Sequence, residues 1–262
     1  MIRALYTAAS GMDAQQANID NIANNLANVN TVGFKRSRVD FEDLMYQQTK
    51  APGSPTSQET EAPIGLESGL GTRAVATVRN FSRGNLRTTG APFDIAIEGN
   101  GFFQLALPGG ETGYTRAGAL HLDSQGQLVT GDGVLLQPTI TIPPNALSVT
   151  ISKDGIVSVA LPNQLAPQQL GTIELATFQN PAGLTARGSS IFTATSASGD
   201  AITGVPGTDG VGTLAQGFLE DSNVSVVEEM VAMILGQRAY EANSRVIRAA
   251  DEMLQQVNNL SR

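Results

Sequence analysis

Residues 226–254 read VVEEMVAMILGQRAYEANSRVIRAADEML. An apolar or aromatic residue recurs at every seventh position, at Val226, Met233, Tyr240, Ile247 and Leu254. A second apolar row lies beside the first, at Val246, Ala250, Met253, Val257 and Leu260. This heptad spacing predicts a helix with an apolar stripe along one side, and the stripe must be buried against another helix.

The N-terminus carries a matching stripe, in which residues step by three and four. Its members are Leu5, Ala8, Met12, Gln15, Ile19, Ile22, Leu26 and Val29. The pattern predicts a helix over residues 1–30, with Gly33 as its left-handed stop. Because this segment is rich in asparagine, its helix propensity is weak and it needs a packing partner. The two stripes predict that the termini meet, and their surplus apolar surface predicts contacts with further copies of the chain.

The chain between the helices divides into two parts. Residues 46–72 are rich in Pro, Gly, Ser and Thr, and the segment is too long for an ordinary connection. We expect an extended loop or a long irregular hairpin there. From residue 73 to 214, short alternating runs such as 94–98, 102–107 and 148–152 are separated by Gly and Asp turns, with a loop expected over 196–213. This pattern predicts antiparallel β-structure.

These patterns together predict an α+β fold. The N- and C-terminal helices should form one coiled-coil domain from residues 1–45 and 215–262. Residues 46–72 should form an extended segment, and residues 73–214 an antiparallel β-rich domain inserted between the helices. We expect Ser222 or Asn223 to cap the C-terminal helix, because both side chains accept hydrogen bonds at helix starts.

Composition excludes several classes of function. The formal net charge is −8 and the densest basic run, at Lys35, Arg36 and Arg38, is followed at once by acidic residues. We therefore expect neither nucleic acid nor an anionic membrane as a partner. The chain has no cysteine, no apolar run long enough to span a bilayer, and no recognisable cleavable signal.

Catalytic and metal-binding patterns are weak. The single histidine, His121, lies in an alternating run beside Asp123, where a solvent-facing strand residue is the simpler interpretation. No cluster has metal-ligand spacing, and Gly99-Asn-Gly101 lacks the rest of a dinucleotide fingerprint. We expect no catalytic, metal or cofactor site. A cell-wall hydrolase with paired carboxylates and a periplasmic binding module remain as alternatives from other classes.

Three N-terminal motifs point to a known family. They are Ala9-Ser-Gly-Met12, Asn24-Asn-Leu-Ala-Asn28 and Thr31-Val-Gly-Phe-Lys35. Together they resemble the N-terminal signature of the bacterial flagellar rod and hook proteins, with Asn30 as a small departure. The resemblance implies that these residues serve assembly: Ser10, Gly11, Met12, Asn24, Asn25, Leu26, Ala27, Asn28, Thr31, Gly33, Phe34 and Lys35. The asparagines and Thr31 should form hydrogen bonds within or between packed helices.

Five further stretches resemble members of the same family, and the later ones resemble its distal rod members most. They are residues 94–103, 114–118, 136–143, 216–224 and 237–243. The extended segment at 46–67 is also similar to one that separates distal rod members from hook members. Proximal rod and hook axial members are the alternatives within the family.

The resemblance implies a structural subunit rather than an enzyme. Copies of the chain should polymerise into a helical tube in the periplasmic part of the flagellar basal body, and the tube should transmit torque. The implied partners are proximal rod proteins, the hook protein, the P- and L-ring proteins and the flagellar export apparatus. Export should occur without cleavage of a signal peptide, and no cofactor is implied.

Overall fold

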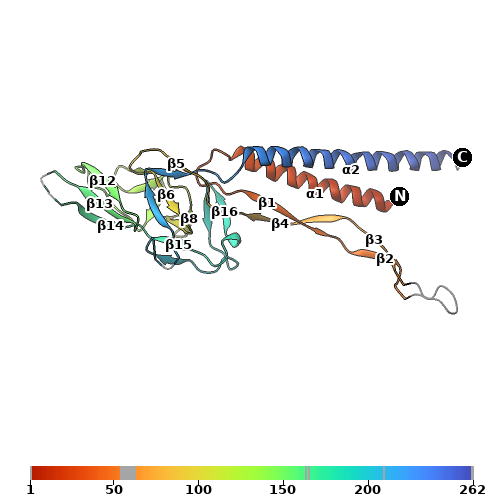
Figure 1. Ribbon diagram of the computed structural model, residues 1–262, viewed down its shortest axis with the longest axis horizontal. Coiled ribbons are helices and arrows are strands. Elements are labelled where there is room, and N and C mark those ends of the chain that lie inside the picture. Colours follow the sequence, from red (N-terminus) through yellow and green to blue (C-terminus); the bar gives the residue numbers. More distant parts are fainter. Residues whose placement is uncertain (1, 54–62, 163, 165, 209, 261–262) are drawn as a thin grey trace. The chain divides into compact units, whose positions relative to one another are not determined.

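The computed structural model describes residues 2–53, 63–162, 164, 166–208 and 210–260 (Figure 1). It confirms the α+β class, because two terminal helices flank a β-rich middle. The chain forms two compact units. The helical unit consists of residues 1–26, 37–78 and 225–262, and the β-rich unit consists of residues 27–36 and 79–224. Within the described residues, no helix has the length and apolarity that crossing a membrane requires.

These units differ from the expected domains in three places. Residues 37–78 join the helices in one unit, whereas 46–72 was expected to stand apart. Residues 27–36 and 215–224 belong to the β-rich unit, although we expected both to belong with the helices. The chain therefore passes between the two units four times.

The helical unit contains α1 (Ile2–Ala27) and α2 (Val226–Leu260). A Cβ atom placed on Gly236 would lie 3.2 Å from Ile19 Cγ1. One placed on Gly11 would lie 2.8 Å from Asn243 Nδ2. As the α2 residue number rises, its α1 neighbour moves back toward the N-terminus, so the two helices are in contact and antiparallel.

A ribbon of four strands runs alongside α1 (Figure 1). β1 (Ser37–Asp43) pairs with β4 (Thr72–Arg79), and β2 (Tyr46–Lys50) pairs antiparallel with β3 (Leu66–Gly69). The amide of Thr72 donates to Ser10 Oγ at 3.4 Å, which holds β4 on the helix. This arrangement is the long hairpin expected as one of two forms for 46–72. Residues 54–62 of that segment lie outside the described residues.

Both expected helix boundaries need correction. α1 ends at Ala27, so Gly33 lies beyond the helix and cannot be its stop. Residues 28–33 form turns instead, with Thr31 N–H and its hydroxyl donating to the main-chain oxygen and side chain of Asn28. α2 begins at Val226, which makes Ser225 the residue before the helix, and the Glu229 amide donates to the Ser225 carbonyl at 3.0 Å. The cap assigned to Ser222 or Asn223 was wrong.

The described residues of the β-rich unit form short strands and one 3₁₀ turn, η1. Their bounds are β5 Leu86–Thr88, β6 Ile95–Glu98, β7 Phe102–Ala106, β8 Thr112–Thr115, β9 Leu120–Leu122, β10 Leu128–Thr130, β11 Leu135–Gln137, β12 Ser148–Ile151, β13 Ile156–Ala160, β14 Gln168–Thr172, β15 Leu175–Thr177, η1 Pro181–Gly183, β16 Thr185–Gly188, β17 Ile191–Thr193, β18 Ile202–Gly204, β19 Thr213–Gln216 and β20 Phe218–Glu220.

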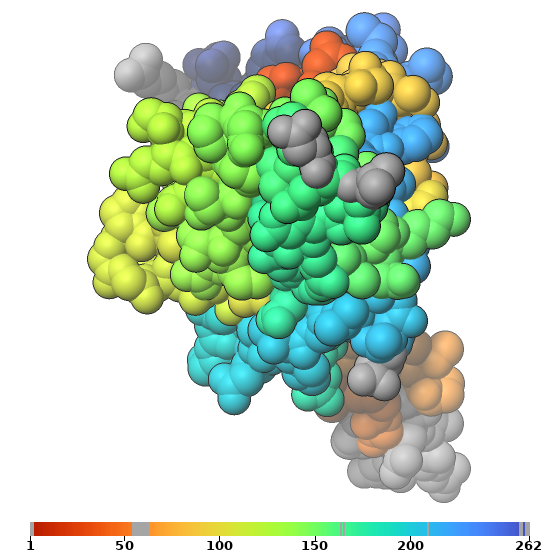
Figure 2. Space-filling view, turned by 90° about the vertical axis from the view of Figure 1, so that its left-hand side faces the viewer, coloured from red at the N-terminus to blue at the C-terminus, as the bar shows by residue number. Residues whose placement is uncertain are grey.

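Consecutive strands separated by predicted Gly and Asp turns pair antiparallel, for example β9 with β10 and β12 with β13. The largest sheet has the order β16-β17-β8-β7-β11-β10-β9, with β15 joining β7 and β18. β12, β13 and β14 form a separate sheet, shown in green on the face of this unit seen in Figure 2. The stretch 196–213 is not all loop as expected, because Ile202–Gly204 is a strand paired with β15.

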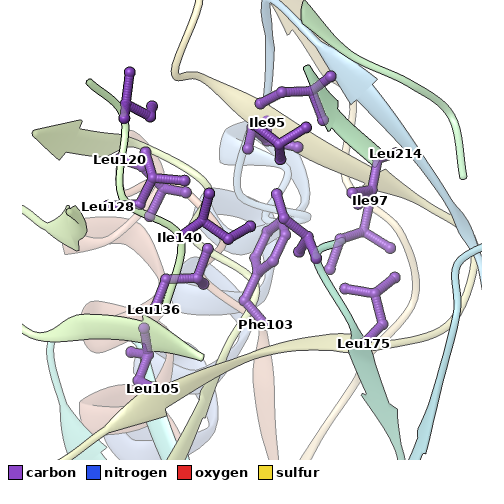
Figure 3. Close-up of a cluster of buried hydrophobic side chains, with 14 of the residues drawn as sticks. Ile95, Ile97, Phe103, Leu105, Leu120, Leu128, Leu136, Ile140, Leu175 and Leu214 are labelled. Carbon is purple, nitrogen blue, oxygen red and sulfur yellow. The ribbon is translucent and has the colours of Figure 1, made fainter. Parts of the chain in front are cut away.

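The main core of the β-rich unit surrounds Phe103, which is fully buried (Figure 3). Ile97 of β6, Leu175 of β15 and Leu214 of β19 are buried in the same cluster. A second core is aromatic, and its rings meet edge to face: Phe102 and Phe178, for example, have centroids 5.8 Å apart. The strands are short, so these two cores rather than long sheet ladders hold the unit together.

Gly118 tests this packing. A Cβ atom there would lie 1.6 Å from the carbonyl oxygen of Ile95, and the Ile95 amide donates to the Gly118 carbonyl at 3.0 Å. Because main chain cannot move aside cheaply, we expect Gly118→Ala to destabilise the β-rich unit by about 3 kcal/mol or more in urea unfolding. Gly131→Ala is the matched control, because nothing lies within 4 Å of its added Cβ. Equal stability of the two variants would contradict the packing described here.

Candidate functional site

A buried polar cluster joins three elements of the helical unit. It consists of Asn21, Asn25, Ser37 and Glu229, and we call it the asparagine cluster. Asn25 Nδ2 donates to the Ser37 carbonyl at 2.8 Å and to Glu229 Oε2 at 3.3 Å, while the Ser37 amide donates to Asn25 Oδ1 at 3.0 Å. The Ser37 hydroxyl also donates to Asn21 Oδ1 at 2.6 Å.

This asparagine cluster fixes the register of the helix pair. Asn25 and Glu229 are each only 1% exposed, so a shift of α1 along α2 would leave buried polar groups without partners. Buried polar groups between helices commonly specify register in this way. The hydrogen bond from Asn25 to Glu229 places one expected motif residue directly between packed helices, as the family resemblance implied.

The line of closest contact on α2 consists mostly of small and polar residues. Glu229, Gly236, Asn243 and Ala250 recur at heptad spacing and face α1 or are buried. The expected seam lies to one side of this line. Met233, Ile247 and Leu254 are half-buried, whereas Val226 and Tyr240 are each 39% exposed. The side chains of Val257 and Leu260, in the second expected row, lie outside the described residues.

A second buried cluster lies in the β-rich unit and centres on Glu220. Lys35 Nζ donates to Glu220 Oε1 at 2.6 Å, and the Gly84 amide donates to the same oxygen at 2.8 Å. Arg116 Nε donates to Glu220 Oε2 at 3.0 Å. We call Lys35, Arg116 and Glu220 the carboxylate cluster.

Main-chain oxygens complete the carboxylate cluster. Lys35 Nζ donates to the Ser82 carbonyl at 2.7 Å. Arg116 Nη1 donates to the carbonyls of Gly99 and Gly101 at 2.9 and 2.7 Å. The cluster holds two cations and one anion, and these carbonyl dipoles offset its surplus positive charge.

Burial dominates the electrostatics of the two cations. Glu220 and Lys35 are each 1% exposed. Burial lowers the pKa of the Lys35 ammonium, and the Glu220 carboxylate opposes the shift. The pKa of the Arg116 guanidinium is lowered for the same reason, again against the effect of Glu220. The Glu220 carboxylate therefore offsets part of the cost of burying both cations.

Gly33 brings the segment before Lys35 close enough to reach this cluster. Its amide donates to the Glu220 carbonyl at 2.8 Å, and its φ of +68° is one that residues with a Cβ rarely adopt. A Cβ atom there would lie 2.6 Å from the Ala117 nitrogen. The role of Gly33 is therefore close approach to the β-rich unit, while Lys35 supplies the charge.

The expected assembly residues do not form one site. Ser10, Gly11 and Asn25 contact other parts of the helical unit, whereas Gly33 and Lys35 are buried in the β-rich unit. Met12, Leu26, Asn28 and Phe34 are half-buried, and Asn24, Ala27 and Thr31 are exposed.

Five residues that complete the two clusters were not expected as site residues. They are Asn21, Ser37, Arg116, Glu220 and Glu229. Asn21 belongs to the asparagine-rich helix but to none of the three N-terminal motifs. A signal for two of them was present, because Arg116 lies in the stretch 114–118 and Glu220 in the stretch 216–224, both of which carry the family resemblance. Ser37 and Glu229 have no such signal. Both look like ordinary polar residues at the start of a strand and of a helix.

Catalytic geometry is not found in the described residues. His121 is exposed and lines an open cavity of about 330 Å³ with Thr31, Asp132 and Ser190. No hydrogen bond joins His121 to a carboxylate or hydroxyl within the described residues. These residues also contain no group of three or more His, Cys, Asp and Glu that could hold a metal.

Known proteins match this chain along its whole length. A flagella basal body rod protein model matches residues 5–35, a flagellar hook protein FlgE/F/G D1 domain model matches 96–159, and a flagellar basal body rod FlgEFG protein C-terminal model matches 215–260. The flagellar basal-body rod protein FlgG of Borreliella burgdorferi is 51% identical over 100% of both chains. The FlgG proteins of Caulobacter vibrioides and Bacillus subtilis are 50% and 42% identical, over 99% and 100% of both chains.

This chain belongs to the flagellar basal-body rod protein family. Each of the three family models covers one member of the carboxylate cluster: Lys35, Arg116 and Glu220 in turn. The cluster is therefore the point at which the three family regions, far apart in sequence, come into contact within this rod family protein.

The first turns of α2 expose an apolar surface. It consists of Val227, Met230, Val231, Ile234 and Leu235, and we call it the apolar face of α2. Val227 is 72% exposed and Leu235 is 64% exposed. The side of the helix that continues this face carries charges instead, and Glu241 pairs there with Arg238 at 3.3 Å and Arg245 at 3.6 Å. Val246 and Met253 are also exposed further along α2, at 47% and 48%, but they are isolated, so contiguous apolar exposure is confined to one end of the helix.

Asn25→Ala tests the asparagine cluster. The change removes a donor and an acceptor, so Ser37 and Glu229 lose buried hydrogen bonds, and we expect the helical unit to lose about 2–4 kcal/mol of stability. Thermal melting of the helix signal in circular dichroism of concentrated protein measures the loss. Asn18→Ala is the matched control, because Asn18 lies in the same helix and takes no part in the asparagine cluster. If both variants melt together, the cluster does not stabilise the helix pair.

Proposed function

We propose that this chain is a structural subunit of the flagellar basal-body rod, and that copies of it polymerise into a helical tube. The apolar face of α2 is the observation that carries the proposal. Five large apolar side chains lie exposed within three turns of one helix. Contiguous apolar surface of this kind is typical of protein contact sites, and a neighbouring copy would remove it from water.

The relatives support the position of the subunit in the flagellum. Three of them are named flagellar basal-body rod protein FlgG, and they match this chain at 42–51% identity over at least 99% of its length. From the family resemblance we infer the distal part of the rod, in the periplasmic part of the basal body. Proximal rod proteins and the hook protein are the proposed neighbours, the P- and L-ring proteins the proposed surroundings, and the flagellar export apparatus the proposed route.

The helix pair supports a coiled-coil core for the polymer. Heptad spacing relates the contacts at Glu229, Gly236 and Asn243, and α1 and α2 are antiparallel along this line. We infer that α1 and α2 form the inner tube together with their counterparts in other copies. Asn25 of the N-terminal motifs acts there by fixing register, and the subunit works by transmitting force rather than by catalysis.

The β2–β3 end of the ribbon supports a stiffening role for residues 46–72. Met45 and Leu66 are large, apolar and exposed on this ribbon, so they are available to a neighbour. We infer that the segment is a separate functional element, even though it packs in the helical unit. Contact between neighbouring ribbons would resist bending of the tube.

Leu235→Lys tests the apolar face of α2. A charge buried against a neighbour costs several kcal/mol, so we expect the critical concentration for polymerisation to rise at least about a hundredfold. Sedimentation and electron microscopy measure it. Ala242→Lys adds the same charge at an exposed position further along the helix, where the surface is already charged, and should polymerise nearly as wild type does. Normal filaments from Leu235→Lys would refute this face as a contact.

Deletion of residues 46–67 tests the stiffening role. We expect the truncated subunit to polymerise, because both helices remain, but to form filaments that curve. Electron microscopy gives the persistence length of filaments of both proteins. Straight filaments of unchanged stiffness after the deletion would count against this role and leave the rod assignment untouched.

A further inference from the structure

Residues 28–36 form a loop without helix or strand, yet this loop belongs to the β-rich unit and is hydrogen-bonded to it. Two of its residues, Gly33 and Lys35, are buried. Its main chain makes three hydrogen bonds to that unit: Gly33 N–H to the Glu220 carbonyl at 2.8 Å, Arg36 N–H to Asn223 Oδ1 at 2.7 Å, and Asn80 N–H to the Arg36 carbonyl at 2.8 Å. The loop contains the motif Thr31-Val-Gly-Phe-Lys35, which lies beyond the end of α1 and so has no part in helix packing.

Asn223 holds two more segments at the same place. Its Nδ2 donates to the Asn80 carbonyl at 2.9 Å and to the Ser82 carbonyl at 3.1 Å, while its Oδ1 accepts from Arg36. Residues 36, 80 and 223 each lie next to a point where the chain leaves or re-enters the β-rich unit. The Asn223 side chain therefore links three of the four points at which the chain crosses between the two units.

Glu220, which accepts the hydrogen bond from Lys35, is also held by residues outside the loop. Glu220, Arg116 and Gly84 all belong to residues 79–224, and their mutual hydrogen bonds do not involve residues 27–36. In addition to Arg116, Lys35 of the loop donates to Glu220. With Glu220 ionised, the buried Lys35 ammonium has an anionic partner at 2.6 Å, but with glutamine at position 220 it would be a buried cation with only neutral acceptors.

We propose that Glu220 is a positioning residue, which holds residues 31–36 on the β-rich unit in the unassembled subunit through Lys35. Residues 31–36 are thereby fixed on the β-rich unit before any neighbouring copy binds. Because this segment is already ordered in the monomer, less conformational entropy is lost when the chain polymerises. Only this last consequence rests on the proposed rod function; the attachment itself is a property of the single subunit.

Hydrogen exchange of the dilute, full-length monomer tests the proposal. We expect the amides of residues 31–36 to be protected in the wild type. Glu220→Gln keeps the size of the side chain and removes its charge, so exchange of 31–36 should accelerate at least about tenfold, while strands β7 and β13 keep their protection. Glu111→Gln is the matched control, because Glu111 pairs with Arg187 on the surface of the same unit.

A double variant distinguishes positioning from general support of the fold. Lys35→Met with Glu220→Gln removes the unpartnered cation and keeps an unbranched side chain, so residues 31–36 should exchange more slowly than in Glu220→Gln alone. Lys35→Met alone leaves the Arg116–Glu220 pair intact. It should accelerate exchange only at 31–36, and it tests the proposal even if Glu220→Gln fails to fold.

Three outcomes would overturn the proposal: unprotected amides at 31–36 in the wild type, unchanged exchange there in Lys35→Met, or equal loss of protection across the β-rich unit in Lys35→Met. The rod function is judged separately. A wild-type chain that never forms filaments but shows the expected exchange pattern would sink the proposed function and leave the role of Glu220 standing.

Discussion

The burial of Glu220 between Lys35 and Arg116 is the interaction on which the connections of this fold depend. Three charged side chains are removed from water, and each would be strongly unfavourable alone. They are tolerated because one carboxylate accepts from both cations and from an amide, while three main-chain carbonyls take the remaining donors. The same arrangement explains why distant segments must meet here, since without Glu220 the buried Lys35 and Arg116 would have no counter-charge.

The two buried clusters use different physics for related tasks. The asparagine cluster is built around neutral amide and hydroxyl groups, with Glu229 at its edge, and it sets the register between helices that already have apolar contact. The carboxylate cluster holds a loop that has no helix or strand of its own, so packing alone could not place it. A short charge-assisted contact supplies both strength and direction there. Each cluster thus appears where apolar packing is insufficient by itself.

Periodicity predicted the elements well but not what brings them together. The heptad and alternating patterns predicted both helices and several of the strands, because burial of one face repeats along an element. They placed the α2 seam at residues 226, 233, 240, 247 and 254, whereas Gly236 and Asn243, which contact α1, lie beside that line. Hydrophobicity marks which residues avoid water, but the closest approach of two helices is permitted by small side chains. The pair Lys35 and Glu220 lies 185 residues apart and follows no period, so only the fold brings it together.

The outer side of α2 shows how polymer contacts can be confined to part of a long helix. Beyond Leu235, charged residues form pairs three and four positions apart, which stabilise a helix in water and need no partner. Before that point, the side chains of the apolar face are exposed to water, and their burial against a neighbouring copy would be favourable in free energy. A subunit bound there would be held at the start of α2, within the same turns as Glu229 of the asparagine cluster. The surface that gains most from a neighbour is therefore the part of α2 whose register on α1 the asparagine cluster fixes.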